Sequence, residues 1–250
     1  MSLPKSYTLI TGASSGIGRQ TALQLSASRR LVLHGRDAAR LEQTRQACAN
    51  PEQHRLWPFD LKKVDQIEAS LTELLKSGDV PVEACVCCAG AVQVLPLRQV
   101  ELPVARDLMN VNFHSAVEIS RLLTARRLNE KHLRRLVFVS STASLFGARG
   151  FQMYCASKAA LDGFMRAIAV ELAPQVRVNS VLPGAVQTPM TDHLLGDPAL
   201  RERMAAVYPL GLGQPSDVAG VIEFLLSDNA NWITGQQIVV DGGRSINHSG

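Results

Sequence analysis

A tyrosine and a lysine stand four residues apart, as Tyr154 and Lys158, in a segment whose apolar residues recur at helical spacing. Residues i and i+4 of a helix share one face, so the phenol and the ammonium can reach the same space. A tyrosine phenol ordinarily ionises near pH ~10, and a neighbouring ammonium lowers that pKa because it stabilises the phenolate. The pair is therefore suited to acid–base chemistry, although taken alone it is more often an accidental pair on a helix surface.

Ser141 changes that interpretation, because it stands thirteen residues before Tyr154 and directly after the apolar segment 136–140. Gly12 and Gly90 also follow apolar segments that have the length of strands. Ligands of open α/β sheets bind beyond the carboxyl ends of the strands. We therefore expect the serine and both glycines to converge with the tyrosine–lysine pair on one ligand site.

The first apolar segment leads into a glycine-rich turn that opens a helical segment. The turn reads Thr11-Gly12-Ala13-Ser14-Ser15-Gly16-Ile17-Gly18. Its glycines allow a tight turn and close backbone approach, and the free N–H groups of a helix start bind a pyrophosphate. Because the turn lies between a strand and a helix in the first βαβ unit, it predicts a nucleotide site.

Short β-branched or aliphatic segments alternate with longer segments of helical period. The expected strands are residues 8–11, 31–34, 55–59, 84–88, 136–140, 177–182 and 237–240. The expected helices are residues 16–28, 37–49, 63–76, 103–128, 152–173 and 216–227. This alternation predicts parallel crossovers and an α/β fold class, a doubly wound Rossmann fold with a seven-stranded parallel sheet. We expect a single domain over residues 1–250, with a substrate loop at about 185–212 where the alternation breaks.

The composition is that of an ordinary globular chain. The 250 residues are 46% hydrophobic and 19% charged, which argues against disorder. The net charge is +4 and the basic residues are spread along the chain, so we expect no nucleic-acid partner. No apolar run approaches the ~18 residues of a membrane span. The first residues contain no apolar signal segment, so we expect a cytoplasmic protein.

Three of the five cysteines, Cys85, Cys87 and Cys88, lie together in an apolar run. The six histidines form no metal-ligand pattern with them, so no metal site is predicted. We expect these cysteines to be reduced and to pack in the core.

The spacing Gly-x-x-x-Gly-x-Gly and the motifs that follow resemble the short-chain dehydrogenase/reductase family. The motifs, in the family's order, are Asp60, Ala89-Gly90, Asn110-Val111-Asn112, Ser140-Ser141, Tyr154-x-x-x-Lys158, Asn179-x-x-x-Pro183-Gly184, Thr188, Ile233-Thr234-Gly235-Gln236 and Val240-Asp241-Gly242-Gly243. The resemblance covers nearly the whole chain. The chain departs from it at Cys87-Cys88, where the family usually has two asparagines that make a polar tie beneath the cofactor.

The resemblance implies a role for each catalytic residue. Ser141 would hold the substrate carbonyl, Tyr154 would transfer the proton, Lys158 would bind the nicotinamide ribose and assist Tyr154, and Asn112 would support a water-linked proton relay. Asn110 is interpreted as structural. Asp60 would contact the adenine ring, or alternatively cap a helix. The implied cofactor contacts are Gly12, Ser14, Ser15, Gly16, Ile17, Gly18, Arg36, Asp60, Leu61, Ala89, Gly90, Asn112, Tyr154, Lys158, Pro183, Gly184 and Thr188.

The choice of nicotinamide cofactor depends on Gly35-Arg36-Asp37. NAD sites commonly place an acid at the end of the second strand, whereas an arginine there accepts a 2′-phosphate. Gly35 takes the place of the acid, and Asp37 is better explained as the N-cap of the next helix. Arg36 therefore favours NADP(H) over NAD, although Ser15 stands where the family often has a second basic residue.

The chain most resembles 3-oxoacyl-carrier-protein reductases, which implies NADPH-dependent reduction of a ketone to a secondary alcohol. A 3-oxoacyl thioester is favoured, because the substrate loop offers an apolar set: Val186, Met190, Leu194, Leu195, Leu200, Met204 and Val207. The alternatives are a sugar, polyol or other secondary-alcohol dehydrogenase, which Thr191, Asp192 and His193 could serve, and a cofactor-binding regulator without catalysis.

The partner expected from this interpretation is a small-molecule or carrier-bound ketone. The expected helices 103–128 and 152–173 are apolar over more than one stripe, as in Leu122-Leu123. Such helices bury more than one face, so we also expect a homo-oligomer, a tetramer by resemblance.

Overall fold

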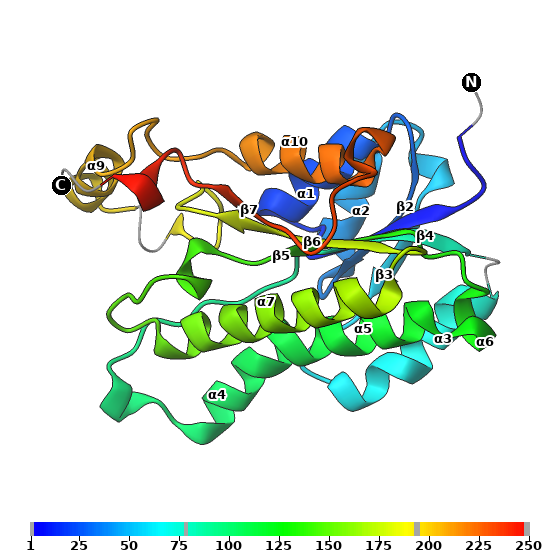
Figure 1. The fold of residues 1–250 in the computed structure, drawn as a ribbon, viewed down its shortest axis with the longest axis horizontal. Coiled ribbons are helices and arrows are strands. Elements are labelled where there is room, and N and C mark those ends of the chain that lie inside the picture. The colour runs from blue at the N-terminus through cyan, green and yellow to red at the C-terminus, as the bar shows by residue number, and fades with distance from the viewer. Residues whose placement is uncertain (1–2, 78–79, 193–195, 248–250) are drawn as a thin grey trace.

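The computed structural model describes residues 3–77, 80–192 and 196–247, and in these residues seven parallel strands form one sheet between two layers of helices (Figure 1). The strands are β1 (Tyr7–Thr11), β2 (Arg30–Gly35), β3 (Arg55–Pro58), β4 (Val82–Cys87), β5 (Arg135–Val139), β6 (Arg177–Pro183) and β7 (Gln237–Val240). Their order is β3-β2-β1-β4-β5-β6-β7, and every neighbouring pair is parallel. The predicted doubly wound Rossmann sheet is confirmed.

Helices cover both faces of the sheet (Figure 1). One face carries α1 (Gly16–Leu25), α2 (Ala38–Ala47) and α10 (Pro215–Leu226). The other face carries α3 (Ile67–Ser77), α4 (Leu102–Met109), α5 (Ser115–Thr124), α6 (Arg126–Asn129) and α7 (Gln152–Leu172). The helix α9 (Pro198–Ala206) follows β6 and lies at the end of the molecule toward which the strands run. No helix among the described residues has the length and apolar character that crossing a membrane requires.

Two hydrophobic cores result, because successive strand residues point to opposite faces. Leu9 of β1 joins the core beneath α3, α5 and α7, and its neighbour Ile10 joins the core beneath α1 and α10. Cys85 and Cys87 lie two residues apart and therefore share the first core, with their sulfur atoms 3.8 Å apart. They are free thiols packed in the core, as the sequence predicts.

The strand order reverses direction between β1 and β4. From β1 the chain winds outward to β2 and β3 and then returns to β4 on the other side of β1. The crevice beyond the carboxyl ends of such strands is where open α/β sheets bind ligands. The Thr11 hydroxyl connects the end of β1 to the loop after β4, because its Oγ1 accepts hydrogen bonds from the N–H groups of Cys88 and Ala89, both at 3.0 Å.

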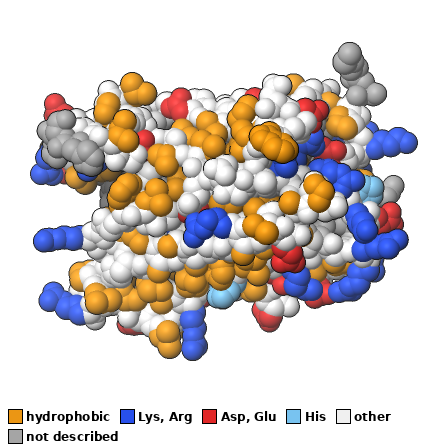
Figure 2. Space-filling view, in the orientation of Figure 1, with side chains coloured by type: hydrophobic (Ala, Val, Ile, Leu, Met, Phe, Trp, Pro, Cys, Tyr) orange, Lys and Arg blue, Asp and Glu red, His pale blue; other side chains and the backbone are white. Residues whose placement is uncertain are grey.

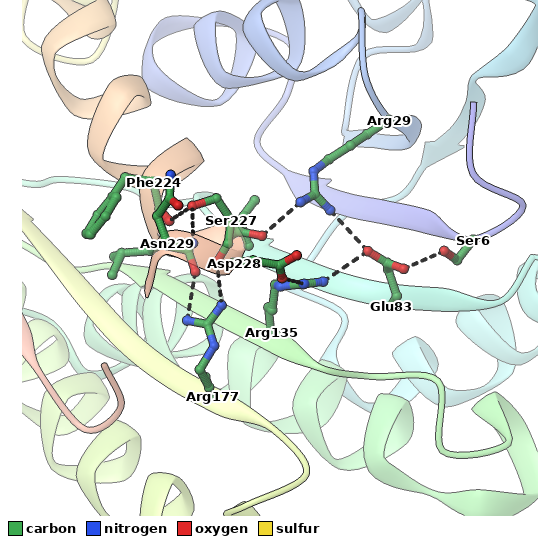
Figure 3. Close-up of polar contacts among 11 residues, drawn as sticks. Ser6, Arg29, Glu83, Arg135, Arg177, Phe224, Ser227, Asp228 and Asn229 are labelled. Carbon is green, nitrogen blue, oxygen red and sulfur yellow. Dashed lines mark hydrogen bonds and ion pairs between the residues drawn. The ribbon is translucent and has the colours of Figure 1, made fainter. Parts of the chain in front are cut away.

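At the amino ends of the strands, opposite the crevice, a charged network joins neighbouring elements (Figure 3). The Glu83 carboxylate accepts hydrogen bonds from Arg29 at 3.1 Å and from Arg135 at 3.2 Å. Arg29 and Arg177 also donate to backbone carbonyls at and just beyond the C-terminal end of α10. These partners satisfy carbonyls that the helix leaves free at its end, and they join α10 to β4, β5 and β6.

The sequence predicts one helix over residues 103–128, and the structure divides it. A π-helical turn, Asn110–His114, separates α4 from α5, and extended backbone at Ala125 ends α5 before α6. A π turn inserts one extra residue without changing the apolar character of the segment, so a 3.6-residue period does not show it. The turn places Asn112 in a buried position beside the site.

Candidate active site

The carboxyl ends of the strands open into a cleft of about 290 Å³. Nearly all of the predicted site residues line it together: Gly12, Ser14, Ser15, Gly16, Ile17, Gly18, Arg36, Asp60, Leu61, Ala89, Gly90, Ser141, Tyr154, Lys158, Pro183, Gly184 and Thr188. Asn112 is buried behind this lining. The convergence that the sequence predicts is therefore present.

The glycine-rich turn delivers the start of α1 into the cleft. Ser15 occupies the N-cap position of α1 and makes no side-chain capping hydrogen bond. A Cβ atom at Gly18 would lie 2.4 Å from the Gly12 carbonyl oxygen, so only glycine allows the turn to close this tightly. A helix start with exposed N–H groups and positive dipole suits a phosphate group.

Tyr154 and Lys158 project from α7 to the same side, as their spacing predicts. The Lys158 Nζ atom lies 5.8 Å from the centre of the Tyr154 ring and donates a hydrogen bond of 2.8 Å to the Val139 carbonyl oxygen of β5. Ser141 follows β5, and its hydroxyl accepts a hydrogen bond from the Ala143 N–H at 3.1 Å. The Tyr154 phenol also interacts with this hydroxyl. The three polar groups therefore meet at one end of the cleft.

Burial controls the ionisation of this pair. It lowers the pKa of the Lys158 ammonium to about 8, and Cys88 and Asp162 partly offset that effect. Burial also raises the pKa of the Tyr154 phenol, against the smaller lowering effect of Ser141. The predicted net lowering of the Tyr154 pKa is therefore wrong, because removal of the phenol from water outweighs the contacts that favour the phenolate. The phenol is protonated at neutral pH and can act as a proton donor.

Asn112 fixes the loop after β4. Its Oδ1 accepts from the Ala91 N–H at 2.7 Å, and its Nδ2 donates to the Ala91 carbonyl and to the Ser157 hydroxyl, both at 2.9 Å. The amide thereby ties Ala91 to α7. Its predicted part in a proton relay remains a prediction. Asn110, interpreted as structural, donates through Nδ2 to the Lys62 carbonyl at 3.2 Å.

Cys88 lines the cleft at a position where the resembling family has asparagine. Burial raises the pKa of its thiol to about 12, so the thiol is neutral at physiological pH. Thr11 holds the backbone at this position, because its Oγ1 accepts hydrogen bonds from the N–H groups of Cys88 and Ala89. Thr11 was not among the predicted site residues, and its position as the last residue of the first strand was the available signal.

Two arginines line the cleft at the end of β2. Asp37 points away from it, since its Oδ1 accepts from the N–H groups of Ala39 and Arg40 at 2.9 and 3.1 Å, and the predicted N-cap of α2 is confirmed. Arg36 and Arg40 both face the cleft, and no carboxylate among the described residues pairs with either. Arg40, in the first turn of α2, was not among the predicted site residues.

The end of β2 also has little room for an acidic side chain. A Cβ atom at Gly35 would lie 3.2 Å both from the Leu41 side chain and from the Ser14 hydroxyl oxygen. Beyond β3, the Asp60 carboxylate accepts from the Lys62 N–H at 3.1 Å and closes a turn. That turn precedes the next helical segment, which begins at Val64, so Asp60 does not cap a helix.

The substrate loop contributes fewer groups than the sequence suggests. Val186, Met190 and Thr191 line the cleft, whereas Leu200, Met204 and Val207 are half-buried elsewhere. The Thr191 hydroxyl is occupied, because it donates to the Val186 carbonyl at 2.7 Å. His193, Leu194 and Leu195 lie outside the described residues.

Comparison with known proteins decides the family. A family model described as enoyl-(acyl carrier protein) reductase matches residues 12–245. The chain belongs to the short-chain dehydrogenase/reductase family. Its members resembling this chain are NAD(P)-dependent dehydrogenases, and this chain is an oxidoreductase of the same kind.

Individual relatives differ in their substrates. The chain is 34% identical to a D-erythrulose reductase of Gallus gallus, over 94% of each chain. It is 32% identical to a 3-oxoacyl-[acyl-carrier-protein] reductase of Thermotoga maritima, over 98% of this chain and 100% of the relative. Among solved structures it is similar, with a TM-score of 0.89 and 31% identity over 98% of this chain and 99% of the other, to a protein of Beutenbergia cavernae provisionally named an NAD(P)-dependent gluconate 5-dehydrogenase, with NADP bound at low occupancy.

Proposed function

We propose that this short-chain reductase uses NADPH to reduce a ketone to a secondary alcohol and that its preferred substrate is a 3-oxoacyl thioester. The observation that supports NADPH is the pair of arginines, Arg36 and Arg40, which face the cleft and have no carboxylate partner in the described part of the chain. A 2′-phosphate offers guanidinium groups charge-assisted, bidentate hydrogen bonds, whereas the ribose hydroxyl of NADH does not. The acid that would bind that hydroxyl is absent at Gly35, and Asp37 is occupied as an N-cap.

The residues of the cleft fit a dinucleotide. The start of α1 would hold the pyrophosphate, and the end of the cleft at Ala89 and Gly90 would admit the nicotinamide. When bound, NADPH supplies the hydride for the carbonyl carbon. The protein itself supplies orientation and the proton.

The catalytic side chains have complementary tasks. The Ser141 hydroxyl donates a hydrogen bond to the carbonyl oxygen, where negative charge develops during reduction. The Tyr154 phenol, which burial keeps protonated, gives its proton to that oxygen. The Lys158 ammonium, held by the Val139 carbonyl, stabilises the phenolate that remains. The meeting of β5 and α7 at this end of the cleft supports these assignments, because it brings the three side chains together.

Exposed apolar side chains on the loops that follow β4, β5 and β6 support an acyl chain as part of the substrate, and Met190 among them lines the cleft. Val94, Leu145, Phe146 and Met190 are large hydrophobic residues with 37%, 50%, 50% and 38% of their surface exposed. The loops that carry the first three are joined, since the Leu95 N–H donates to the Gly150 carbonyl at 3.0 Å. Burial against apolar side chains stabilises a methylene group by about 0.8 kcal/mol.

The hydroxyl groups nearby offer little to a sugar. Ser144 donates its hydroxyl proton to the Ser141 carbonyl, and Thr191 donates to the Val186 carbonyl. A buried sugar hydroxyl without a partner costs roughly 1–3 kcal/mol on mutational scales. Reduction of a small sugar ketone is the second candidate, because the avian relative is described as a D-erythrulose reductase and Asp192 is exposed beside Thr191.

A substrate comparison tests the proposal. NADPH oxidation is measured with acetoacetyl thioester and with a panel of ketoses and simple ketones at equal concentration. We expect the highest kcat/KM with the thioester. Faster turnover of any sugar than of every oxoacyl thioester would contradict the proposed thioester substrate, while the proposal of ketone reduction would remain.

We also propose that the chain forms a homo-oligomer, with a tetramer as the expected state. Hydrophobic side chains gather along the face where α7 lies over α4 and α5 (Figure 2). Val170 of α7 and Leu102 of α4 are 82% and 62% exposed, and Trp232, near β7, is fully exposed. Apolar residues exposed to this extent on two faces favour burial against further copies of the chain.

A further inference from the structure

A buried carboxylate lies one helical turn beyond Lys158. Asp162 stands on α7 with 2% of its surface exposed. Its Oδ2 accepts a hydrogen bond of 2.9 Å from the Ser140 hydroxyl. Its Oδ1 is buried and has no hydrogen-bond partner among the described residues. A carboxylate removed from water with one oxygen unpaired costs stability, so its presence behind an active site requires an explanation.

Ser140 connects this carboxylate to the site. The residue follows β5 and directly precedes Ser141, and its N–H donates to the Val181 carbonyl of β6 at 2.8 Å. Its hydroxyl lies between the Asp162 carboxylate and the Lys158 carbonyl oxygen, which is 3.4 Å away. Asp162 therefore joins the strand end that carries Ser141 to the helix turn that carries Lys158.

The Lys158 ammonium faces a small set of charged or titratable groups. They are Cys87 and Cys88 at the end of β4, Tyr154 one turn earlier on α7, and Asp162 one turn later. From β5 it meets the Val139 carbonyl, and the nearby amide of Asn112 is neutral. The Cys88 thiol and the Tyr154 phenol are neutral at pH 7, since burial raises the pKa of each. Asp162 is thus the carboxylate of this set, and its charge opposes the desolvation of the ammonium.

We propose that Asp162 is a positioning residue of the active site, which holds the Ser140–Ser141 strand end in place and stabilises the positive charge of Lys158 one helical turn away. The proposal rests on the function proposed above for Ser141 and Lys158. It explains why α7 carries a buried acid where an apolar residue would pack against β5 and β6 at lower cost. Along α7 the carboxylate lies one turn beyond Lys158, and Tyr154 lies one turn before it.

The variant Asp162→Asn separates the charge from the shape, because an amide can still accept the Ser140 hydrogen bond. Two pH profiles are measured, the affinity for NADPH by fluorescence titration and kcat/KM for ketone reduction. In the variant, the alkaline limb of both profiles moves to lower pH by about half a unit or more, since the ammonium loses its stabilising charge. The smaller Asp162→Ser gives the same shift and serves if Asp162→Asn does not fold.

Asp241→Asn is a matched control. Asp241 is also buried beyond the strand ends, and its oxygens accept hydrogen bonds from the N–H groups of Gly243 and Ser245 at 3.0 and 2.7 Å. This variant should keep both alkaline limbs at the wild-type pH. The proposal would be overturned if the Asp162 variants fold with a lower Tm but keep the alkaline limbs of both pH profiles at the wild-type pH. That result is expected of an acid that only stabilises the fold. If the wild type binds NADPH but reduces no ketone, the proposed function fails, and the affinity profile still decides the role of Asp162.

Discussion

Replacing Arg36 with alanine should lower kcat/KM for NADPH by about 10- to 30-fold and leave kcat/KM for NADH nearly unchanged. A hydrogen bond to a charged group contributes about 1.5–3 kcal/mol. Arg36 is exposed and Arg40 leaves a second positive charge beside the same part of the cleft, so the lower part of that range applies. A loss of about 1.5–2 kcal/mol corresponds to the stated fold-change, at about 1.4 kcal/mol for each factor of ten.

The assay measures initial rates with both cofactors over a series of salt concentrations. The preference of the wild type for NADPH should decrease as salt screens the arginine–phosphate attraction. Arg45→Ala is the matched control, because Arg45 also lies on α2 but pairs with Glu42 at 2.7 Å and does not line the cleft. Arg36→Asp should reverse the preference. Equal losses of kcat/KM for both cofactors in Arg36→Ala, or a wild-type preference for NADH, would refute this role of Arg36. Asp37 would then be the candidate for binding the ribose hydroxyl of NAD.

Three further outcomes are expected. Glu83→Ala should lower the free energy of unfolding by about 1–3 kcal/mol and Tm by roughly 2–12 °C, because Arg29 and Arg135 lose their shared carboxylate; an unchanged melting curve would contradict this (Figure 3). The kcat/KM for ketone reduction should fall as pH rises through about 8, where the Lys158 ammonium loses its proton, and a profile flat to pH 10 would exclude that assignment. Light scattering at micromolar concentration should show an oligomer, whereas a particle of 27.1 kDa would remove the tetramer proposal.

The fold was predictable because it depends on short-range pattern. The expected strand 31–34 corresponds to Arg30–Gly35, and the expected helix 152–173 corresponds to Gln152–Leu172. Strands buried on both faces are continuous apolar runs, and α7 has a long apolar period, so both leave a strong signal. The π turn at Asn110–His114 leaves none, since it adds a residue without changing the residue types.

The sequence predicts which residues form the site better than it predicts their pKa values. The glycine turn, Ser141, Tyr154 and Lys158 all follow strand ends or share a helix face, so topology brings them together. The direction of the Tyr154 pKa depends on burial by residues distant in the sequence, and the spacing of the pair does not contain that information. The burial of Asp162 could not be predicted from the sequence either, because an acid four residues after a lysine is typical of an exposed helical ion pair.

The most direct test of the reductase mechanism compares the wild type with Tyr154→Phe. The assay measures NADPH oxidation with acetoacetyl thioester, together with NADPH affinity by fluorescence titration. Removal of the phenol proton should lower kcat by about 10²- to 10⁴-fold, the usual contribution of a general acid. The affinity for NADPH and the Tm should remain near those of the wild type, because the ring still packs against Phe151 and α7 is unchanged. A Tyr154→Phe enzyme that turns over at close to the wild-type rate would contradict the assignment of Tyr154 as the proton donor.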